Sequence, residues 1–70
     1  MDVTFFDRNS DVLGVEPELE IKQIPISEIE SLIDLVRKYG YQDCNGVDYL
    51  FEYAQVEPEG VCIYLLKKEK

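Results

Sequence analysis

The sequence predicts an α+β fold, in which one helix packs on one face of an antiparallel sheet of about four strands. Three observations lead to this prediction. Apolar and polar residues alternate in several short segments, one central segment has helical periodicity with matching end signals, and turn-forming residues separate these segments. The chain has 70 residues, so we expect a single domain covering residues 1–70.

The first half of the chain contains the segments expected to form strands before the helix. Residues 3–6 form an apolar, β-prone run, residues 7–11 are turn formers, and residues 12–15 fit a short return strand. After Pro17, residues 18–24 alternate as a half-buried strand does. Its two faces are Leu19, Ile21 and Gln23 on one side and Glu18, Glu20 and Lys22 on the other.

The central segment predicts a helix over residues 28–39. Ser27 followed by Glu30 has the spacing of a capping box, and Gly40 is the residue type expected just beyond a helix end. Acidic residues precede basic residues along the segment, which suits the helix dipole. The apolar stripe consists of Ile29, Leu32, Ile33 and Val36.

The second half predicts a loop and then a hairpin. Residues 41–46 are expected as loop, residues 47–56 favour a strand over a helix, residues 57–60 form a turn, and residues 61–66 form the last strand. The resulting ββαββ order resembles that of β-grasp domains, and this resemblance concerns the fold alone. No Gly-Gly ends the sequence, so we expect neither a modifier nor a sulfur-carrier role.

The last two strands are apolar on both faces, which one helix cannot cover. Alternation places Val61, Ile63 and Leu65 opposite Cys62, Tyr64 and Leu66, and it places Tyr49, Phe51 and Tyr53 opposite Leu50 and Ala54. An uncovered face rich in tyrosine is typical of an interface, either with a second copy or with another protein. The alternative is that the N-terminal segment covers this face and that these residues belong to the core.

The formal net charge is −8, and the acidity is concentrated in the first half of the chain. Glu16, Glu18 and Glu20 alternate, so on one extended segment their carboxylates stand roughly 6.6 Å apart, which is similar to the spacing of phosphates along a nucleic-acid strand. Such a surface suits the basic groove of a nucleic-acid enzyme and repels nucleic acid itself. The alternative is that these acids are only the solvated faces of a strand and a helix.

Several chemistries are disfavoured by the residues present. The chain has no histidine to act as a base or a zinc ligand, and Cys44 follows Asp43, which opposes thiolate formation. No glycine-rich phosphate loop occurs. Residues 7–18 partly match a calcium-binding loop but carry Val12 where glycine is required. We therefore expect no enzyme activity, no cofactor and no metal, with a weak calcium site as a minor alternative.

The compartment and partner class follow from what the sequence lacks. The first residues do not resemble a secretory signal, no apolar run is long enough to span a bilayer, and both cysteines are expected to be reduced. We therefore expect a cytoplasmic protein that binds neither a membrane nor nucleic acid directly. The expected partner is a protein with a basic surface, such as a nucleic-acid-handling enzyme.

These observations predict a non-enzymatic inhibitor or regulator that occludes a basic surface of a partner enzyme. In size and charge the chain resembles phage or mobile-element anti-defence (anti-CRISPR-like) proteins and antitoxins, and the acidic surface is expected to act as a DNA mimic. The alternative is a small homodimeric accessory subunit that uses the apolar sheet face. The expected partner-binding residues are Glu16, Glu18, Glu20, Glu28, Glu30, Asp34, Tyr49, Phe51, Tyr53 and Tyr64.

Overall fold

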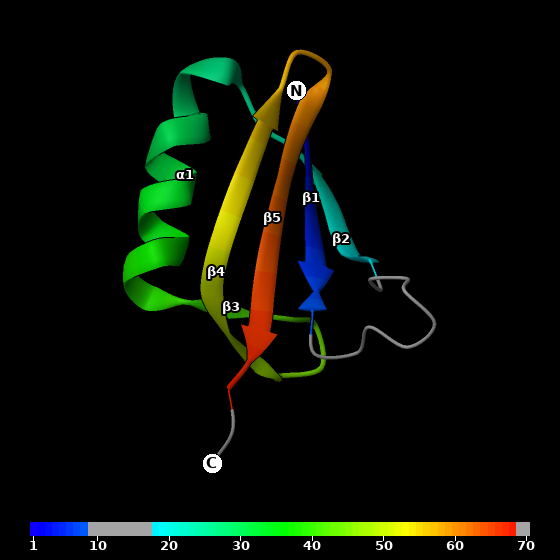
Figure 1. Cartoon of the computed structure of the whole chain (residues 1–70), viewed down its shortest axis with the longest axis vertical. Coiled ribbons are helices and arrows are strands. Elements are labelled where there is room, and N and C mark those ends of the chain that lie inside the picture. Colours follow the sequence, from blue (N-terminus) through cyan, green and yellow to red (C-terminus); the bar gives the residue numbers. More distant parts are fainter. Residues whose placement is uncertain (9–17, 69–70) are drawn as a thin grey trace.

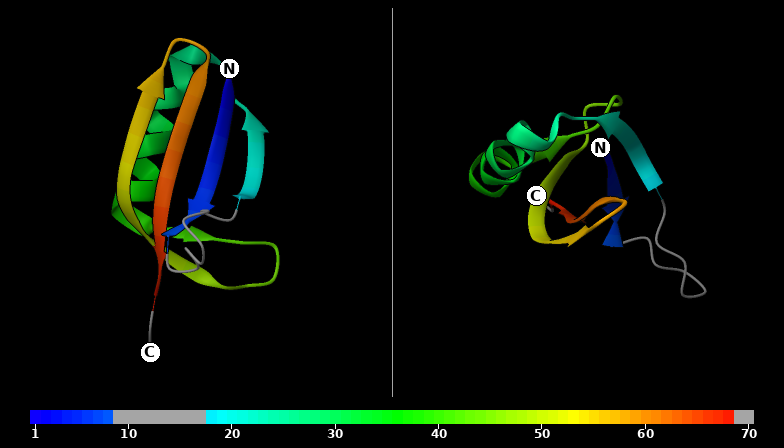
Figure 2. Two further views of the ribbon diagram at one scale, coloured as in Figure 1. Left: turned by 45° about the vertical axis from the view of Figure 1, so that its right-hand side comes forward. Right: turned by 90° about the horizontal axis from the view of Figure 1, so that it is seen from above.

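One helix lies on the inner side of a curled sheet of five strands in this computed structural model, which describes residues 1–8 and 18–68 (Figures 1 and 2). The elements in chain order are β1 (Asp2–Asp7), β2 (Glu18–Gln23), α1 (Ile26–Tyr39), β3 (Tyr41–Gln42), β4 (Asp48–Glu57) and β5 (Gly60–Lys67). The α+β class and the order of two strands, a helix and a strand hairpin are therefore confirmed. The two-residue strand β3 is an addition, at the start of the segment expected to be loop.

The sheet is mixed, and the expectation of a purely antiparallel sheet was wrong. The strand order is β2-β1-β5-β4-β3, in which β1 pairs with β2 and β5 pairs with β4 in antiparallel fashion. The central pair, β1 and β5, is parallel. The two hairpins are each local, but the contact between the first and last strands joins segments far apart in the sequence, and local patterns do not report its direction.

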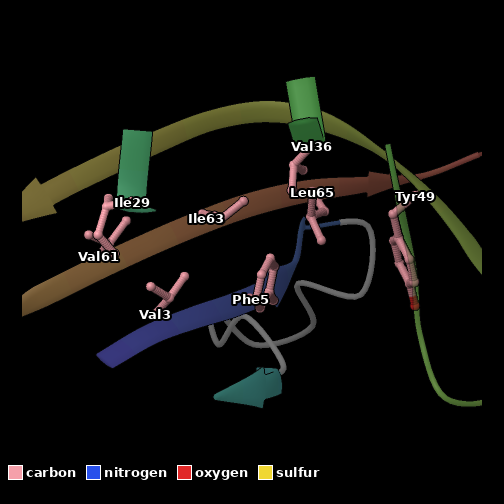
Figure 3. Packing of buried hydrophobic residues seen from close by; sticks show 8 residues of the cluster. All are labelled: Val3, Phe5, Ile29, Val36, Tyr49, Val61, Ile63 and Leu65. Carbon is pink, nitrogen blue, oxygen red and sulfur yellow. The ribbon is translucent and has the colours of Figure 1, made fainter. Parts of the chain in front are cut away.

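The core lies between α1 and the inner face of the sheet. Val3 and Phe5 of β1 and the alternate residues Val61, Ile63 and Leu65 of β5 are at most 1% exposed. Ile29 and Val36 of α1 and Tyr49 of β4 complete the buried cluster, which Figure 3 shows from close by. The predicted separation of the two faces of β5 is thus confirmed, because Cys62, Tyr64 and Leu66 all retain solvent contact.

The helix begins earlier than expected, and the predicted capping box is absent. Pro25 occupies the cap position with no side-chain hydrogen bond, and Glu28 N–H donates to the Pro25 carbonyl over 2.8 Å. Ser27 therefore lies inside the first turn, because proline already supplies the backbone angles that a cap residue needs. The predicted end is confirmed, since Gly40 follows the last helical residue and its N–H donates to the Val36 carbonyl.

A bulge in β4 changes which residues share a face. The register with β5 shifts between Phe51 and Tyr53, so the strand holds one extra residue, Glu52. Phe51 pairs with Leu65 on the inner face, whereas Tyr53 pairs with Tyr64 on the outer face. The expectation that Tyr49, Phe51 and Tyr53 share one face was therefore wrong, because the bulge moves Tyr53 to the outer face and Ala54 to the inner one.

The edge strand β2 turns Glu20 and Lys22 toward the core side, and the expectation that Glu18 shares their face was wrong because the register with β1 shifts between Phe5 and Phe6. Glu20 pairs with buried Phe5 and Lys22 pairs with buried Val3, while Ile21 pairs with Thr4 on the outer face and is 54% exposed. The Lys22 ammonium lies 6.0 Å from the centre of the Phe5 ring, so its aliphatic stem helps to cover the core margin. The return strand predicted for residues 12–15 and the calcium-loop pattern lie outside the described residues.

Candidate interaction surface

The outer face of the sheet carries a row of stacked aromatic rings across three strands. The Phe6 ring of β1 stacks on Tyr64 of β5 with ring centres 5.2 Å apart. Tyr64 in turn stacks on Tyr53 of β4 at 4.5 Å. We call these three residues the aromatic row. It depends on the parallel pairing of β1 with β5, which sets Phe6 beside Tyr64, and on the bulge that turns Tyr53 outward.

Arg8 closes one end of the aromatic row. Its guanidinium donates a hydrogen bond to the Tyr53 hydroxyl over 3.0 Å and lies 5.5 Å from the centre of that ring. The same guanidinium nitrogen lies 3.6 Å from the Glu52 carboxylate. The bulged segment of β4 and the end of β1 are thereby held together, which fixes the orientation of Tyr53 before any partner binds.

Aliphatic side chains extend the aromatic row into a wider apolar surface. Leu50 of β4 pairs with Leu66 of β5 on the outer face. Their exposed fractions are 50% and 37%, and that of Tyr53 is 39%. Within the part of the chain that the structure describes, α1 covers the opposite face of the sheet and no helix or strand covers this one (Figure 2). The arrangement suits contact with another macromolecule.

Carboxylates lie on the outer face at several points around this apolar surface. Glu18 pairs with Phe6 in the register of β1 and β2, and Asp2 and Glu57 both pair with Gly60 at the far end of the sheet. Glu52 lies beside Arg8, and Asp2 accepts a hydrogen bond from the Gln23 amide. An apolar centre with an acidic rim favours a partner surface that is itself apolar at its centre and basic at its rim.

The predicted acidic residues do not form one continuous surface. Glu18 is exposed on β2, whereas the Glu20 carboxylate accepts a hydrogen bond from Tyr41 and lies 4.0 Å from the Lys22 ammonium. Glu28, Glu30 and Asp34 are exposed on α1, which lies beside β4, near the edge of the sheet opposite to β2 (Figure 1).

Neighbours in sequence are also separated on the helix itself. Glu28 and Glu30 are two residues apart, so they lie on opposite sides of α1. Asp34 is paired with Arg37 at 3.4 Å. Glu16 lies outside the described residues. The predicted row of three alternating glutamates was wrong, because the register shift places Glu18 beside Phe6 on the outer face and Glu20 beside Phe5 on the inner one.

Two of the four predicted aromatic anchors lie inside the molecule. Tyr49 is 5% exposed and belongs to the core, and Phe51 is half-buried beneath the guanidinium of Arg37, 5.3 Å from its ring centre. Tyr49 hydrogen-bonds the buried carboxylate of Asp7. Tyr53 and Tyr64 lie on the outer face.

The environment of Tyr49 and Tyr41 keeps both phenols protonated. Burial, followed by the charge of Asp7, raises the pKa of Tyr49. Burial and the hydrogen bond to Glu20 raise the pKa of Tyr41. The Tyr41 ring also stacks on Phe5 with ring centres 4.5 Å apart, so Tyr41 covers the core beside Phe5. Both tyrosines therefore serve the fold, and neither is arranged as a general base.

The remaining features offer little chemistry. Within residues 1–8 and 18–68, no group of three or more metal-ligating side chains gathers, and both cysteines are free thiols, exposed at Cys44 and half-buried at Cys62. A shallow cavity of about 350 Å³ lies between the end of α1 and the start of β4, with Tyr39, Leu50 and Lys68 in its wall. No helix of the described chain has the length and apolar character needed to cross a membrane.

Sequence reasoning did not place Phe6, Arg8, Leu50, Glu52 and Glu57 in the contact surface, whereas the acidity expected of the first half includes Asp2. Alternation along β1, with Val3 and Phe5 inward, is a signal that identifies Phe6 as an outer residue. The contribution of Arg8 has no such signal, because it depends on a bulge in a strand far along the chain. Compared with known proteins, the chain matches no family model, no curated protein and no solved structure.

Proposed function

We propose that this protein is a non-enzymatic inhibitor or regulator that docks the outer face of its sheet on a basic surface of a partner protein. The observation that carries the proposal is the partly exposed aromatic row, flanked by Leu50 and Leu66, with carboxylates at several points on the same face. The apolar centre supplies affinity through burial, and the acidic rim supplies orientation and fast encounter.

The charge favours an enzyme that handles nucleic acid as the partner. A net charge of −8 on 70 residues is attracted to the basic grooves with which such enzymes hold phosphates. Occupying such a groove would exclude the nucleic acid, so binding alone is enough to inhibit. In this mechanism the protein contributes no reacting group, and its action is stoichiometric.

The experiment compares matched variants in capture from a lysate of the natural host or target cell. Tyr53→Ser combined with Leu66→Ser alters the outer face, and Leu35→Ser combined with Tyr39→Ser makes the same residue changes on α1, where the two residues are 55% and 72% exposed. We expect the wild type and the helix variant to retain a basic partner that elutes as salt rises, and the outer-face variant to lose it.

The outcomes separate the proposal from its alternatives. Equal retention by both variants would exclude the outer face as the contact. A partner whose retention does not change with salt concentration would refute the proposed role of the carboxylates. If the bait captures only further copies of itself, the homodimeric accessory subunit becomes the better account, and this second candidate is favoured by the same exposed apolar face.

A further inference from the structure

The edge of β4 is the longest unpaired strand edge among the described residues. β3 pairs only with Asp48 and Tyr49 of β4, so β4 continues from Leu50 to Glu57 without a neighbouring strand on that side. Unpaired N–H and C=O groups along a strand edge are a template for another strand. The rest of β4 after the bulge, Tyr53–Glu57, is regular in its pairing with β5, which leaves an extended edge available for strand addition.

The other edge of the sheet is better protected. β2 is six residues long, and Glu18, Glu20 and Lys22 alternate along it. The pairing of β2 with β1 is also irregular, with a register shift between Phe5 and Phe6. Short length, charged side chains and irregular pairing are the features by which proteins discourage strand addition. By contrast, the segment of β4 after the bulge carries a single charged residue, Glu57.

One side of α1 faces this open edge. The Arg37 guanidinium lies over the Phe51 ring of β4, which identifies the side of the helix next to the strand. Glu30 precedes Arg37 by seven residues and Ile26 precedes it by eleven, about two and three helical turns, so both share that side. Figure 1 places the first turn of α1 and the last residues of β4 at the same end of the molecule.

The side chains beside the edge of β4 indicate which kind of segment would bind there. Ile26 and Val56 are 74% and 63% exposed, and they offer apolar contacts on the inner side of the edge. Within the described chain, Glu30 and Glu57 have no basic partner, whereas Asp34 and Glu52 are paired with arginines. A strand added here would therefore meet apolar side chains and two carboxylates without counterions.

We propose that β4 binds an extended basic segment of the partner protein, which adds a sixth strand to the sheet along Tyr53–Glu57. Main-chain hydrogen bonds hold the segment. On its inner side, apolar side chains contact Ile26 and Val56 and a basic side chain pairs with Glu30. On its outer side, which Glu57 shares with its pairing partner Gly60, a second basic side chain pairs with Glu57. This inference rests on the proposed function, because it describes the partner that the outer face is expected to meet.

A short acetylated and amidated peptide of repeating Lys-Lys-Val-Val, which as a strand carries lysine and valine on both faces, tests the inference. Titrated into the labelled protein, it should shift the amide resonances of Tyr53–Glu57 and slow their hydrogen exchange, while those of β2 stay unchanged. A peptide of repeating Glu-Glu-Val-Val is the control and should leave β4 unperturbed. Shifts confined to β2 or to the aromatic row, or no shifts, would overturn the assignment.

Charge-matched variants make the test specific. Glu30→Lys with Glu57→Lys should weaken binding of the lysine–valine peptide roughly fivefold or more, as expected when two exposed ion pairs become repulsive. Glu28→Lys with Glu18→Lys is the control, because it makes the same change in net charge on the other side of α1 and on β2. It should weaken binding of the peptide less than twofold, which corresponds to about 0.4 kcal/mol of binding free energy. If both variants weaken binding equally, the peptide is held only by general charge attraction, and the proposed site on β4 is refuted.

The proposed function and this inference fail separately. If the peptide does not perturb β4 but partner capture still depends on Tyr53 and Leu66, the edge site alone is refuted. A peptide that binds β4, together with partner capture that is insensitive to the outer-face variant, would instead refute the proposed contact face.

Discussion

Replacing Gly40 by alanine should destabilise the fold far more than the same change at Gly46. Gly40 has φ +81° and ψ −164°, a backbone region that is accessible essentially to glycine alone. An added Cβ would lie 2.6 Å from the Tyr49 carbonyl oxygen, closer than a carbon can approach, and backbone cannot simply rotate away. Gly46 has the same φ of +81°, but an added Cβ there meets nothing within 4 Å.

The expected magnitudes follow from these two environments. Gly40→Ala should cost about 3 kcal/mol, at the upper end for backbone strain because the clash adds to it. Gly46→Ala should cost about 1 kcal/mol, from the positive φ alone. At roughly 4–8 °C per kcal/mol for a domain of this size, the melting temperature should fall by about 12–24 °C in the first variant and about 4–8 °C in the second.

Thermal unfolding followed by circular dichroism measures this difference. The account predicts that Gly40→Ala melts clearly below Gly46→Ala and that both retain the native spectrum when cold. Equal melting temperatures would refute the argument that the close approach of Gly40 to β4 positions the end of α1. The position of β3 beside the start of β4 depends on the same approach.

Two further outcomes are expected from the core and its tyrosines. Ile63→Ala, at a fully buried position, should lower the free energy of unfolding measured in urea by about 2–5 kcal/mol. Leu66→Ala, on the outer face, should lower it by about 1 kcal/mol or less. Equal losses would contradict the assignment of inner and outer faces. The pKa values of Tyr41 and Tyr49 are raised in the folded chain, so stability should be fully present below the ordinary phenol value of 10.0 and should fall as pH rises through the raised values. Tyr41→Phe should make this loss with pH shallower, and a urea midpoint that does not change above pH 10.0 would refute the burial of these phenols.

The elements of the fold were predictable where the signal is local. The stripe on α1 and the glycine after it gave the helix and its end, and alternation along β5 separated core residues from outer ones. The helix start was missed because Pro25 and Ser27 are both acceptable near a cap, and only the backbone angles distinguish them.

The candidate site was less predictable because its geometry is set by distant pairing. Tyr53 joins Tyr64 only through a bulge that depends on the register of β4 with β5. Glu20 lies on the core side because it pairs with Phe5, and Tyr41, from beyond the helix, donates a hydrogen bond to it there. Counting charges along the chain indicated an acidic half, but the fold distributes those carboxylates over a sheet edge and two sides of a helix.

Oxidative footprinting of the captured complex tests the proposed contact most directly. Tyr53 and Tyr64 report on the outer face, and Tyr39, which is 72% exposed on α1, is an internal control. The account predicts that binding protects Tyr53 and Tyr64 from oxidation and leaves Tyr39 as reactive as in the free protein. Protection of Tyr39 with unchanged reactivity at Tyr53 and Tyr64 would contradict the proposal that this protein acts through the outer face of its sheet.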